Sequence, residues 1–262
     1  MEERYPVIPG AEPFFIKGNQ IGILICHGFV GTPQSVKYLG ESLANQGFTV
    51  YGVRLSGHGT HYRDMERCCY EDWIQSLEEG FHLLQEHCEE IFVVGQSMGG
   101  TLTSHLASKF SNIKGIMLIN AAMTSIPPME EYKNNRHPRY VPEGEPDIKD
   151  KTVSEITYTK APIESMNQLF ALMEKTQGRL RSITCPTLAF QSLEDHVVPP
   201  ENTDFILENI RSAEKEIVQL TNSYHVASMD FEKDFIAEKC SAFITKYKSK
   251  TSDLVAAIAP GL

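Results

Sequence analysis

The stretch IFVVGQSMG at residues 91–99 decides the fold of this chain. Its aliphatic first half is typical of a buried strand, and residues 98–110 are compatible with a helix. A strand, then Gly-x-Ser-x-Gly, then a helix is the pattern of a nucleophile elbow, a sharp turn that exposes a serine hydroxyl. Gly95 and Gly99 are small enough for such a turn. We therefore interpret Ser97 as a nucleophile at the end of a strand, rather than as a serine in an ordinary glycine-flanked turn.

Around this stretch, short aliphatic runs alternate with helix-compatible segments. Strands are expected at residues 21–26, 48–53, 91–94, 113–120, 187–191 and 216–220, and helices at 33–46, 70–88, 98–110, 164–175, 203–210 and 232–247. Repeated strand–helix–strand units with buried strands predict parallel pairing and right-handed crossovers. The expected fold class is α/β, with a mostly parallel central sheet flanked by helices.

The alternation stops between residues 123 and 178. Six prolines interrupt this stretch, no clear strand is expected in it, and its clearest element is an amphipathic helix at 164–175. A loop of this length inside a compact domain is usually functional, so we expect a helical cap or lid, with a simple helical excursion as the alternative. The expected organisation is a core at 1–122 and 179–247, a cap at 123–178 and a C-terminal tail at 248–262.

The composition limits the kinds of partner that the protein can bind. The 24 lysines and arginines against 34 aspartates and glutamates give a formal net charge of −10. This charge argues against nucleic acid and against electrostatic docking to anionic membranes. It suits a neutral small-molecule substrate, and we expect a monomer or a homodimer.

Several absent patterns indicate location and cofactor use. The six cysteines form no C-x-x-C pair, and residues 1–6 do not resemble a signal peptide, so we expect free thiols in the cytoplasm. No run reaches the ~18 apolar residues that a membrane span requires. The chain contains neither a His-Glu-x-x-His motif nor a phosphate-binding loop, so no metal or other cofactor is expected.

A serine nucleophile needs a general base and an acid that orients the base. Asp195 follows the expected strand at 187–191, and His225 follows the last expected strand. Loops at the carboxyl ends of parallel strands meet at one edge of the sheet, and the chain order Ser–Asp–His is the usual one for such a fold. Glu194 and His196 are the weaker alternatives for the acid and the base.

The tetrahedral oxyanion needs two backbone N–H donors. One is expected from Met98, directly after the nucleophile, where a helix begins with unpaired N–H groups. The other is expected from Phe29, in the small-residue loop HGFVG at 27–31 that follows the first aliphatic strand. His27 is interpreted as a brace for this loop and not as the base.

Several motifs outside the elbow carry a family resemblance, namely GHGTHY at 57–62, SMGGTLT at 97–103, EDHVVPP at 194–200 and NSYHVA at 222–227. Together they resemble the bacterial (bacillus-type) monoacylglycerol lipases and their carboxylesterase relatives in the α/β-hydrolase superfamily. The resemblance runs from Tyr5 to Tyr247. It implies an α/β-hydrolase fold, in which Ser97, Asp195 and His225 form the catalytic triad and Phe29 and Met98 donate to the oxyanion.

The resemblance also implies a substrate and two further site residues. Asn120 and Glu155 match positions near the glycerol end of the substrate, although a strand-end turn former and an exposed cap carboxylate are the alternatives. The sequence departs from the family at Gln96 and in the cap at 125–145. The expected function is hydrolysis of monoacylglycerols through an acyl-enzyme. A broad-specificity carboxylesterase, an acyl transferase to alcohols and a non-catalytic lipid-binding module remain alternatives.

Overall fold

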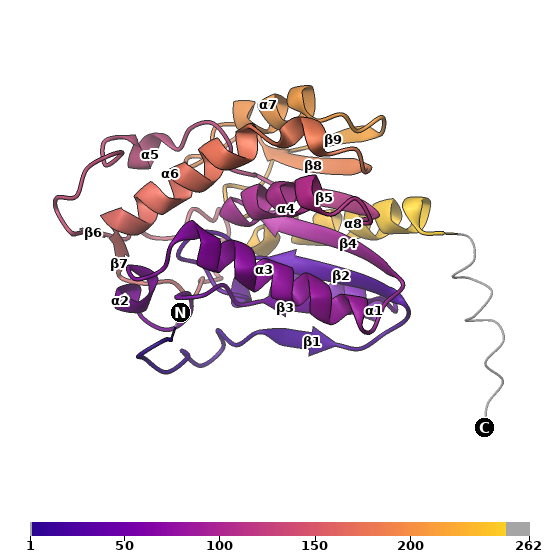
Figure 1. Cartoon of the computed structure of the whole chain (residues 1–262), viewed down its shortest axis with the longest axis horizontal. Coiled ribbons are helices and arrows are strands. Elements are labelled where there is room, and N and C mark those ends of the chain that lie inside the picture. Colours follow the sequence, from indigo (N-terminus) through magenta and orange to yellow (C-terminus); the bar gives the residue numbers. More distant parts are fainter. Residues whose placement is uncertain (1, 250–262) are drawn as a thin grey trace.

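The computed structural model describes residues 2–249, so most of the expected tail at 248–262 lies outside the described residues. A seven-stranded sheet with strand order β1-β3-β2-β4-β5-β8-β9 forms the centre of the molecule (Figure 1). Its strands are β1 (Phe14–Ile16), β2 (Ile21–Cys26), β3 (Thr49–Val53), β4 (Glu90–Gln96), β5 (Gly115–Ile119), β8 (Thr187–Ser192) and β9 (Lys215–Leu220). β1 pairs antiparallel with β3, and the other pairings are parallel. The expected fold class is confirmed.

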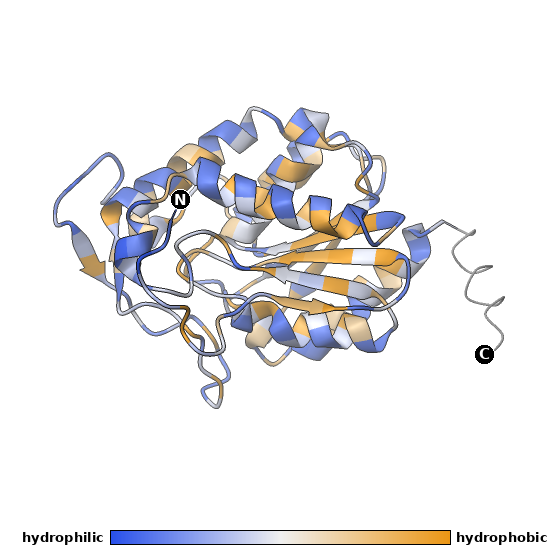
Figure 2. Ribbon diagram, turned by 60° about the horizontal axis from the view of Figure 1, so that its bottom comes forward, coloured by the Kyte–Doolittle hydropathy of each residue, from blue (hydrophilic) through white to orange (hydrophobic). Residues whose placement is uncertain are grey.

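Helices cover both faces of the sheet. One face carries α3 (Tyr70–Gln85), α4 (Met98–Lys109) and α6 (Ile163–Gln177), and the other carries α1 (Gln34–Asn45) and α8 (Lys233–Tyr247). Alternate residues of β2 point to opposite faces of the sheet: Leu24 belongs to one core cluster, and Ile23 and Ile25 belong to the other. This alternation follows from the period of two along a strand. Figure 2 shows hydrophobic residues along the strands and hydrophilic residues on the outward sides of the helices.

Between β5 and β8 the chain first runs beyond the end of the sheet where β5 finishes, and then returns along α6, which packs beside α3 and α4 (Figure 1). This segment contains α5 (Pro127–Glu130), β6 (Tyr140–Pro142), β7 (Lys160–Pro162), α6 and the short 3₁₀ turn Leu180–Ser182. α6 buries Met166, Leu169 and Met173 against the core that the sheet shares with α3 and α4. Excision of this segment would remove that apolar stripe and expose the part of the core that it covers.

Several short elements differ from the sequence-based expectation. β6 and β7 pair antiparallel in the segment where no clear strand was expected. Each has only three residues and includes proline, so neither shows the alternation that identifies a strand. Other differences are the edge strand β1 and the four-residue helix α2 (Tyr62–Met65), which were not expected, and α7 (Glu201–Asn209), which begins two residues early. Within residues 2–249, no helix is long and apolar enough to cross a membrane.

Candidate active site

The turn between β4 and α4 places Ser97 in a strained backbone conformation. Its φ of 55° and ψ of −122° lie in a region that residues other than glycine rarely adopt, and such strain is typical of functional sites. The turn is possible because the chain passes very close to itself. A Cβ atom on Gly95 would lie 2.1 Å from the carbonyl oxygen of Gly99, and one on Gly99 would lie 2.3 Å from the carbonyl oxygen of Cys26. Both positions therefore require glycine.

Three residues expected to form the catalytic triad lie in one hydrogen-bonded chain. The Nε2 atom of His225 lies 2.9 Å from the Ser97 hydroxyl oxygen, and its Nδ1 atom lies 2.8 Å from Oδ2 of Asp195. Since a carboxylate can only accept, the proton of the neutral imidazole resides on Nδ1 and donates to Asp195. Nε2 is then free to accept the proton of the serine hydroxyl. This is the geometry that general-base activation of a serine requires.

The loop after β8 fixes the carboxylate of Asp195. Its Oδ1 atom accepts the backbone N–H groups of Val197 at 2.9 Å and Val198 at 2.8 Å, and only 1% of the side chain is exposed. The other oxygen is therefore left for His225. The rival Glu194 is exposed and pairs with Lys149 at 3.1 Å, away from His225. The rival base His196 contacts Asp147 through its Nδ1 atom at 2.8 Å.

Buried charge sets the protonation of His225. Burial alone would lower its pKa, but the charge of Asp195 and the hydrogen bond to it, followed by the charges of Asp147 and Glu155, hold the pKa above its ordinary value. The imidazolium form that arises after proton abstraction is thus stabilised.

The loop after β2 passes directly beside the serine. A Cβ atom on Gly28 would lie 3.2 Å from Cβ of Ser97 and 3.7 Å from its hydroxyl oxygen. The backbone N–H groups of Phe29 and Met98 donate to no other group in the described part of the chain. Two free donors therefore lie on segments that flank the serine, as the expected oxyanion hole requires.

His27 braces this loop as a neutral imidazole. Its Nε2 atom accepts the backbone N–H of Leu55 at 3.3 Å, so its Nδ1 atom carries the proton and donates to the Gly28 carbonyl at 2.9 Å. Burial, with the nearby His58, lowers the pKa of His27 well below its ordinary value. The His58 ring lies against His27, Phe29 and Trp73.

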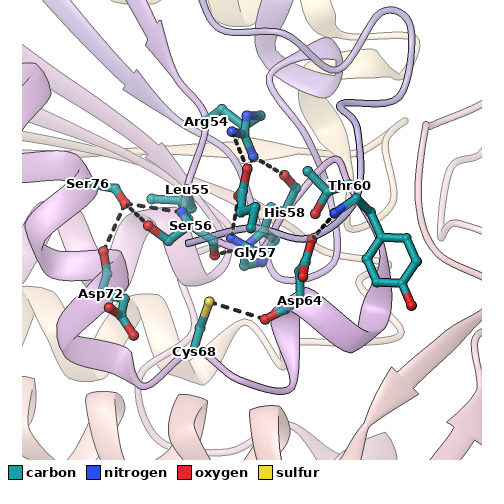
Figure 3. Close-up of polar contacts among 12 residues, drawn as sticks. Arg54, Leu55, Ser56, Gly57, His58, Thr60, Asp64, Cys68, Asp72 and Ser76 are labelled. Carbon is teal, nitrogen blue, oxygen red and sulfur yellow. Dashed lines mark hydrogen bonds and ion pairs between the residues drawn. The ribbon is translucent and has the colours of Figure 1, made fainter. Parts of the chain in front are cut away.

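Polar contacts hold the segment that carries His58 (Figure 3). The Arg54 guanidinium donates to the His58 carbonyl at 2.7 Å, and the Ser56 backbone N–H donates to the Ser76 hydroxyl at 3.1 Å. Ser76 in turn donates to the Asp72 carbonyl at 2.8 Å, which joins the segment to α3. The segment behind the oxyanion loop is therefore fixed from both ends.

Asn120, expected at the glycerol end of the substrate, contacts other parts of the protein instead. Its amide nitrogen donates to Ser192 Oγ and to the His225 carbonyl, both at 2.9 Å, and its amide oxygen accepts the Ser192 N–H at 2.8 Å. Asn120 is 3% exposed, has a positive φ of 45°, and is not among the residues that line the cavity beside Ser97. It joins β5 to the loops that carry the acid and the base.

Gln96, whose identity the sequence did not explain, also connects two segments of the site. Its side-chain oxygen accepts the backbone N–H of Ser228 at 3.1 Å, and the Ser228 hydroxyl donates to the Ser35 carbonyl at 2.7 Å. Ser228 lies three residues after His225. Gln96 therefore ties the nucleophile strand to the segment that follows the base.

Asp147 is a site residue that sequence reasoning missed. One carboxylate oxygen accepts the backbone N–H groups of His225 at 3.1 Å and His196 at 3.2 Å, and the other contacts the His196 ring. Its carbonyl also accepts the Val226 N–H at 3.1 Å. Asp147 thus connects the segment between β5 and β8 to the loops that carry Asp195 and His225. Its sequence context, GEPDIKD at 144–150, has the composition of an ordinary loop and gave no signal.

A cavity of ≈ 120 Å³ opens beside Ser97. Its apolar lining comes from Phe29, Val30, Ile126, Met129, Leu169 and Val197, and its acidic lining comes from Glu143, Glu145, Asp147 and Glu155. Burial raises the pKa of Glu143 to about 7. Burial also raises the pKa of Glu155 to about 7, against the lowering effects of Ser35 and His225. In residues 2–249, no group of three His, Cys, Asp or Glu side chains is placed to hold a metal ion.

Comparisons with known proteins agree with this architecture. The family described as "Serine aminopeptidase, S33" (Hydrolase_4) matches residues 19–232. The chain is 48% identical to a thermostable monoacylglycerol lipase of Bacillus sp. (strain H-257), over 94% of this chain and 99% of the relative. It is 26% identical to a carboxylesterase of Bacillus subtilis (strain 168), over 90% of this chain and 96% of the relative.

Solved structures give the same result. A structure described under two metagenome-derived lipolytic enzymes, LipS and LipT, matches with a TM-score of 0.88 and 41% identity, over 92% of this chain and 100% of that one. A monoglyceride lipase of Saccharomyces cerevisiae matches at 16% identity with a TM-score of 0.80, over 95% of each chain, which is a likeness of fold alone. The protein therefore belongs to the Hydrolase_4 family of serine hydrolases and has the α/β-hydrolase fold.

Proposed function

We propose that this protein hydrolyses the ester bond of monoacylglycerols, with Ser97 as nucleophile, His225 as base and Asp195 as the acid that orients the base. The observation that carries the proposal is the continuous chain from the Ser97 hydroxyl through His225 to Asp195, with separations of 2.9 Å and 2.8 Å. The substrate class follows from the relative that is 48% identical over nearly the whole chain.

The reaction starts when His225 Nε2 takes the Ser97 proton and the serine oxygen bonds to the ester carbonyl carbon. The Phe29 and Met98 N–H groups donate to the resulting oxyanion. The bond to the alcohol then breaks, and the imidazolium returns its proton to the departing glycerol oxygen. Water repeats the sequence on the acyl-enzyme, which releases the fatty acid and restores Ser97. No cofactor enters this scheme.

The cavity places a limit on how substrate enters. Its ≈ 120 Å³ holds several water-sized groups, at ~10–15 Å³ each, but is smaller than the ~300 Å³ at which pockets for larger ligands begin. A glycerol head group or the first few acyl carbons fit. We propose that residues 123–178 act as a cap that moves to admit a long chain, since Ile126, Met129 and Leu169 from this segment line the cavity.

Residues Asn120 and Glu155 take different parts in this proposal. Glu155 lines the cavity and contributes to its charge, so it remains a substrate-contacting residue. Asn120 is proposed as a positioning residue, because its amide is occupied by Ser192 and the His225 loop.

A comparison of two esters tests the substrate class. Release of fatty acid from 1-monooleoylglycerol is expected to exceed release from diolein by about tenfold or more, because space that holds a glycerol head group beside Ser97 cannot also hold a second acyl chain on that head group. Equal rates would contradict the monoacylglycerol assignment and favour the broad-specificity carboxylesterase. Since the family description names an aminopeptidase, an aminoacyl p-nitroanilide is the amide control, and it is expected to react more slowly than either ester.

The location and partners remain proposals as well. A cytoplasmic location is supported by the six cysteines, all of which are free thiols. A small-molecule lipid ester is the proposed partner. The oligomeric state, monomer or homodimer, stays a prediction that size-exclusion chromatography with light scattering can check.

A further inference from the structure

Glu143 places an unpaired carboxyl in the active-site cavity. Its backbone N–H donates to the Thr159 carbonyl at 3.1 Å, which fixes the residue directly after β6. Its side chain lines the cavity and makes no hydrogen bond or ion pair within residues 2–249. Because no protein group occupies this carboxyl, a ligand in the cavity can contact it directly.

Glu155 provides a second carboxyl in the same cavity. A Cβ atom on Gly31 would lie 2.7 Å from its Oε1 atom, so the absence of a side chain at Gly31 leaves room for this carboxyl beside the oxyanion loop. Both carboxyls line the same cavity, and the charge of Glu143 adds to the burial that raises the pKa of Glu155, so the two groups repel each other when both are ionised. Glu155 and His225 also interact electrostatically.

The alcohol half of the ester must occupy this region. His225 protonates the departing alcohol oxygen, so the alcohol lies beside His225 at the moment of bond cleavage. Glu155 interacts with the same imidazole. The group attached to the alcohol oxygen is therefore the part of the substrate that meets Glu155 and Glu143.

The acidic side chains of the cavity lining face only one basic group, His225. Four of its side chains are carboxylic acids, and none is lysine or arginine. Asp147 is already occupied by the His225 and His196 N–H groups. Two cations near these acids along the chain pair elsewhere: Arg139 with Glu66 at 2.6 Å, and Lys149 with Glu194 at 3.1 Å. An anionic head group, such as a phosphate, would face repulsion here, whereas a cationic group would relieve it.

We propose that Glu143, together with Glu155, is a specificity-determining residue that favours esters whose alcohol carries an ammonium group, as in amino-alcohol esters. This inference rests on the proposed function, because it needs Ser97 to cleave the ester. A neutral polyol can hydrogen-bond to these carboxyls, but it brings no positive charge to offset the repulsion between them. An ammonium group offsets both charges.

A pair of isosteric esters separates charge from shape. Octanoylcholine carries a trimethylammonium group, and 3,3-dimethylbutyl octanoate carries a neutral tert-butyl group of the same shape. The ratio of kcat/KM for the cationic ester to that for the neutral ester is measured in the wild type and in Glu143→Gln, which keeps the shape and removes the charge. The matched control is Glu130→Gln, an exposed cap residue outside the cavity lining with the same charge change.

The wild type is expected to prefer the cationic ester, and Glu143→Gln is expected to lower the ratio by about tenfold to one hundredfold, the range for a lost contact to a charged group. Glu130→Gln should change it by less than about twofold, since exposed charges are screened. A ratio near one in the wild type, or a ratio that Glu143→Gln leaves unchanged, overturns the inference. An equal drop in Glu130→Gln overturns it too, because the effect would then be long-range charge.

Two further measurements separate this inference from the proposed function. If the wild type cleaves neither octanoyl ester nor 1-monooctanoylglycerol, the proposed function itself fails. If it cleaves all three and Glu143→Gln slows only 1-monooctanoylglycerol, Glu143 binds hydroxyl groups and the ammonium preference is wrong. Equal labelling of each variant by a fluorophosphonate confirms that its active site is folded.

Discussion

Replacement of Asp147 by asparagine should move the acid limb of the pH–rate profile to lower pH. Asp147 Oδ2 lies 3.1 Å from the backbone nitrogen of His225, and its charge helps to raise the pKa of that histidine. Asparagine keeps an oxygen that can accept the backbone N–H groups but loses the charge. The imidazolium of His225 is then less stabilised, so its pKa falls and the base form persists to lower pH.

The size of the shift follows from Coulomb's law. If the charges of the imidazolium and the carboxylate are taken as ~6 Å apart, they interact by about 0.7 kcal/mol in water and about 2.8 kcal/mol at an effective dielectric constant of ~20. One pKa unit corresponds to 1.36 kcal/mol, so these limits span about 0.5 to 2 units. The Asp147 side chain is 17% exposed and also contacts His196, which places the expected shift near one unit.

The assay is kcat/KM for a p-nitrophenyl ester between pH 5 and 9. The wild-type limb should have an apparent pKa above the ordinary histidine value of about 6.5, and Asp147→Asn should lower it by about one unit. Glu194→Gln is the matched control, because it removes an exposed charge from the neighbouring loop and should shift the limb by less than about 0.2 units. If Asp147→Asn lowers the plateau value of kcat/KM but leaves the apparent pKa of the acid limb unchanged, the reasoning is refuted, because Asp147 would then only hold the two loops together.

Three other substitutions probe the contacts around the triad. Gln96→Leu leaves the buried Ser228 N–H without its acceptor, so kcat should fall and the free energy of unfolding, measured by urea denaturation, should decrease by about 1–3 kcal/mol. Unchanged values of both quantities would show that Gln96 does not position the segment after His225. Asn120→Ala should lower kcat with little change in KM for 1-monooleoylglycerol, whereas a rise in KM alone would restore Asn120 as a substrate contact. Glu143→Gln should raise the melting temperature at pH 8 more than at pH 5. Folding raises the pKa of the Glu143 carboxyl from 4.5 to about 7. Its contribution to stability is therefore fully present below pH 4.5 and is lost as the pH rises through about 7. An equal change in melting temperature at both pH values would mean that Glu143 is not protonated in the folded protein.

The parts of the site that could be predicted from sequence are those that local rules dictate. The elbow at 91–99 needs glycine at fixed places beside Ser97, and the loops after β8 and β9 must meet at one edge of a parallel sheet. Those two constraints were enough to predict Asp195 as the acid and His225 as the base, which the hydrogen-bonded chain to Ser97 supports. The oxyanion loop followed from the same edge rule.

The parts that sequence missed depend on contacts between distant segments. Asp147 sits in a proline-rich loop, and its importance arises only because that loop folds back onto His225, 78 residues away. Gln96 and Asn120 likewise act through partners 132 and 105 residues away. The short strands β6 and β7 escaped detection because three-residue strands depend on their partner rather than on their own pattern. No local rule encodes such pairings.

Mass spectrometry of the chain after fluorophosphonate treatment tests the central claim most directly, since only an activated serine reacts readily with this reagent. We predict one adduct, on the peptide that contains Ser97, with no adduct and no ester hydrolysis in Ser97→Ala and much slower labelling in His225→Ala. An adduct on another residue, or full ester hydrolysis by a folded Ser97→Ala variant, would contradict the account. Absence of any adduct on the wild-type chain would contradict it as well and would favour the non-catalytic lipid-binding module.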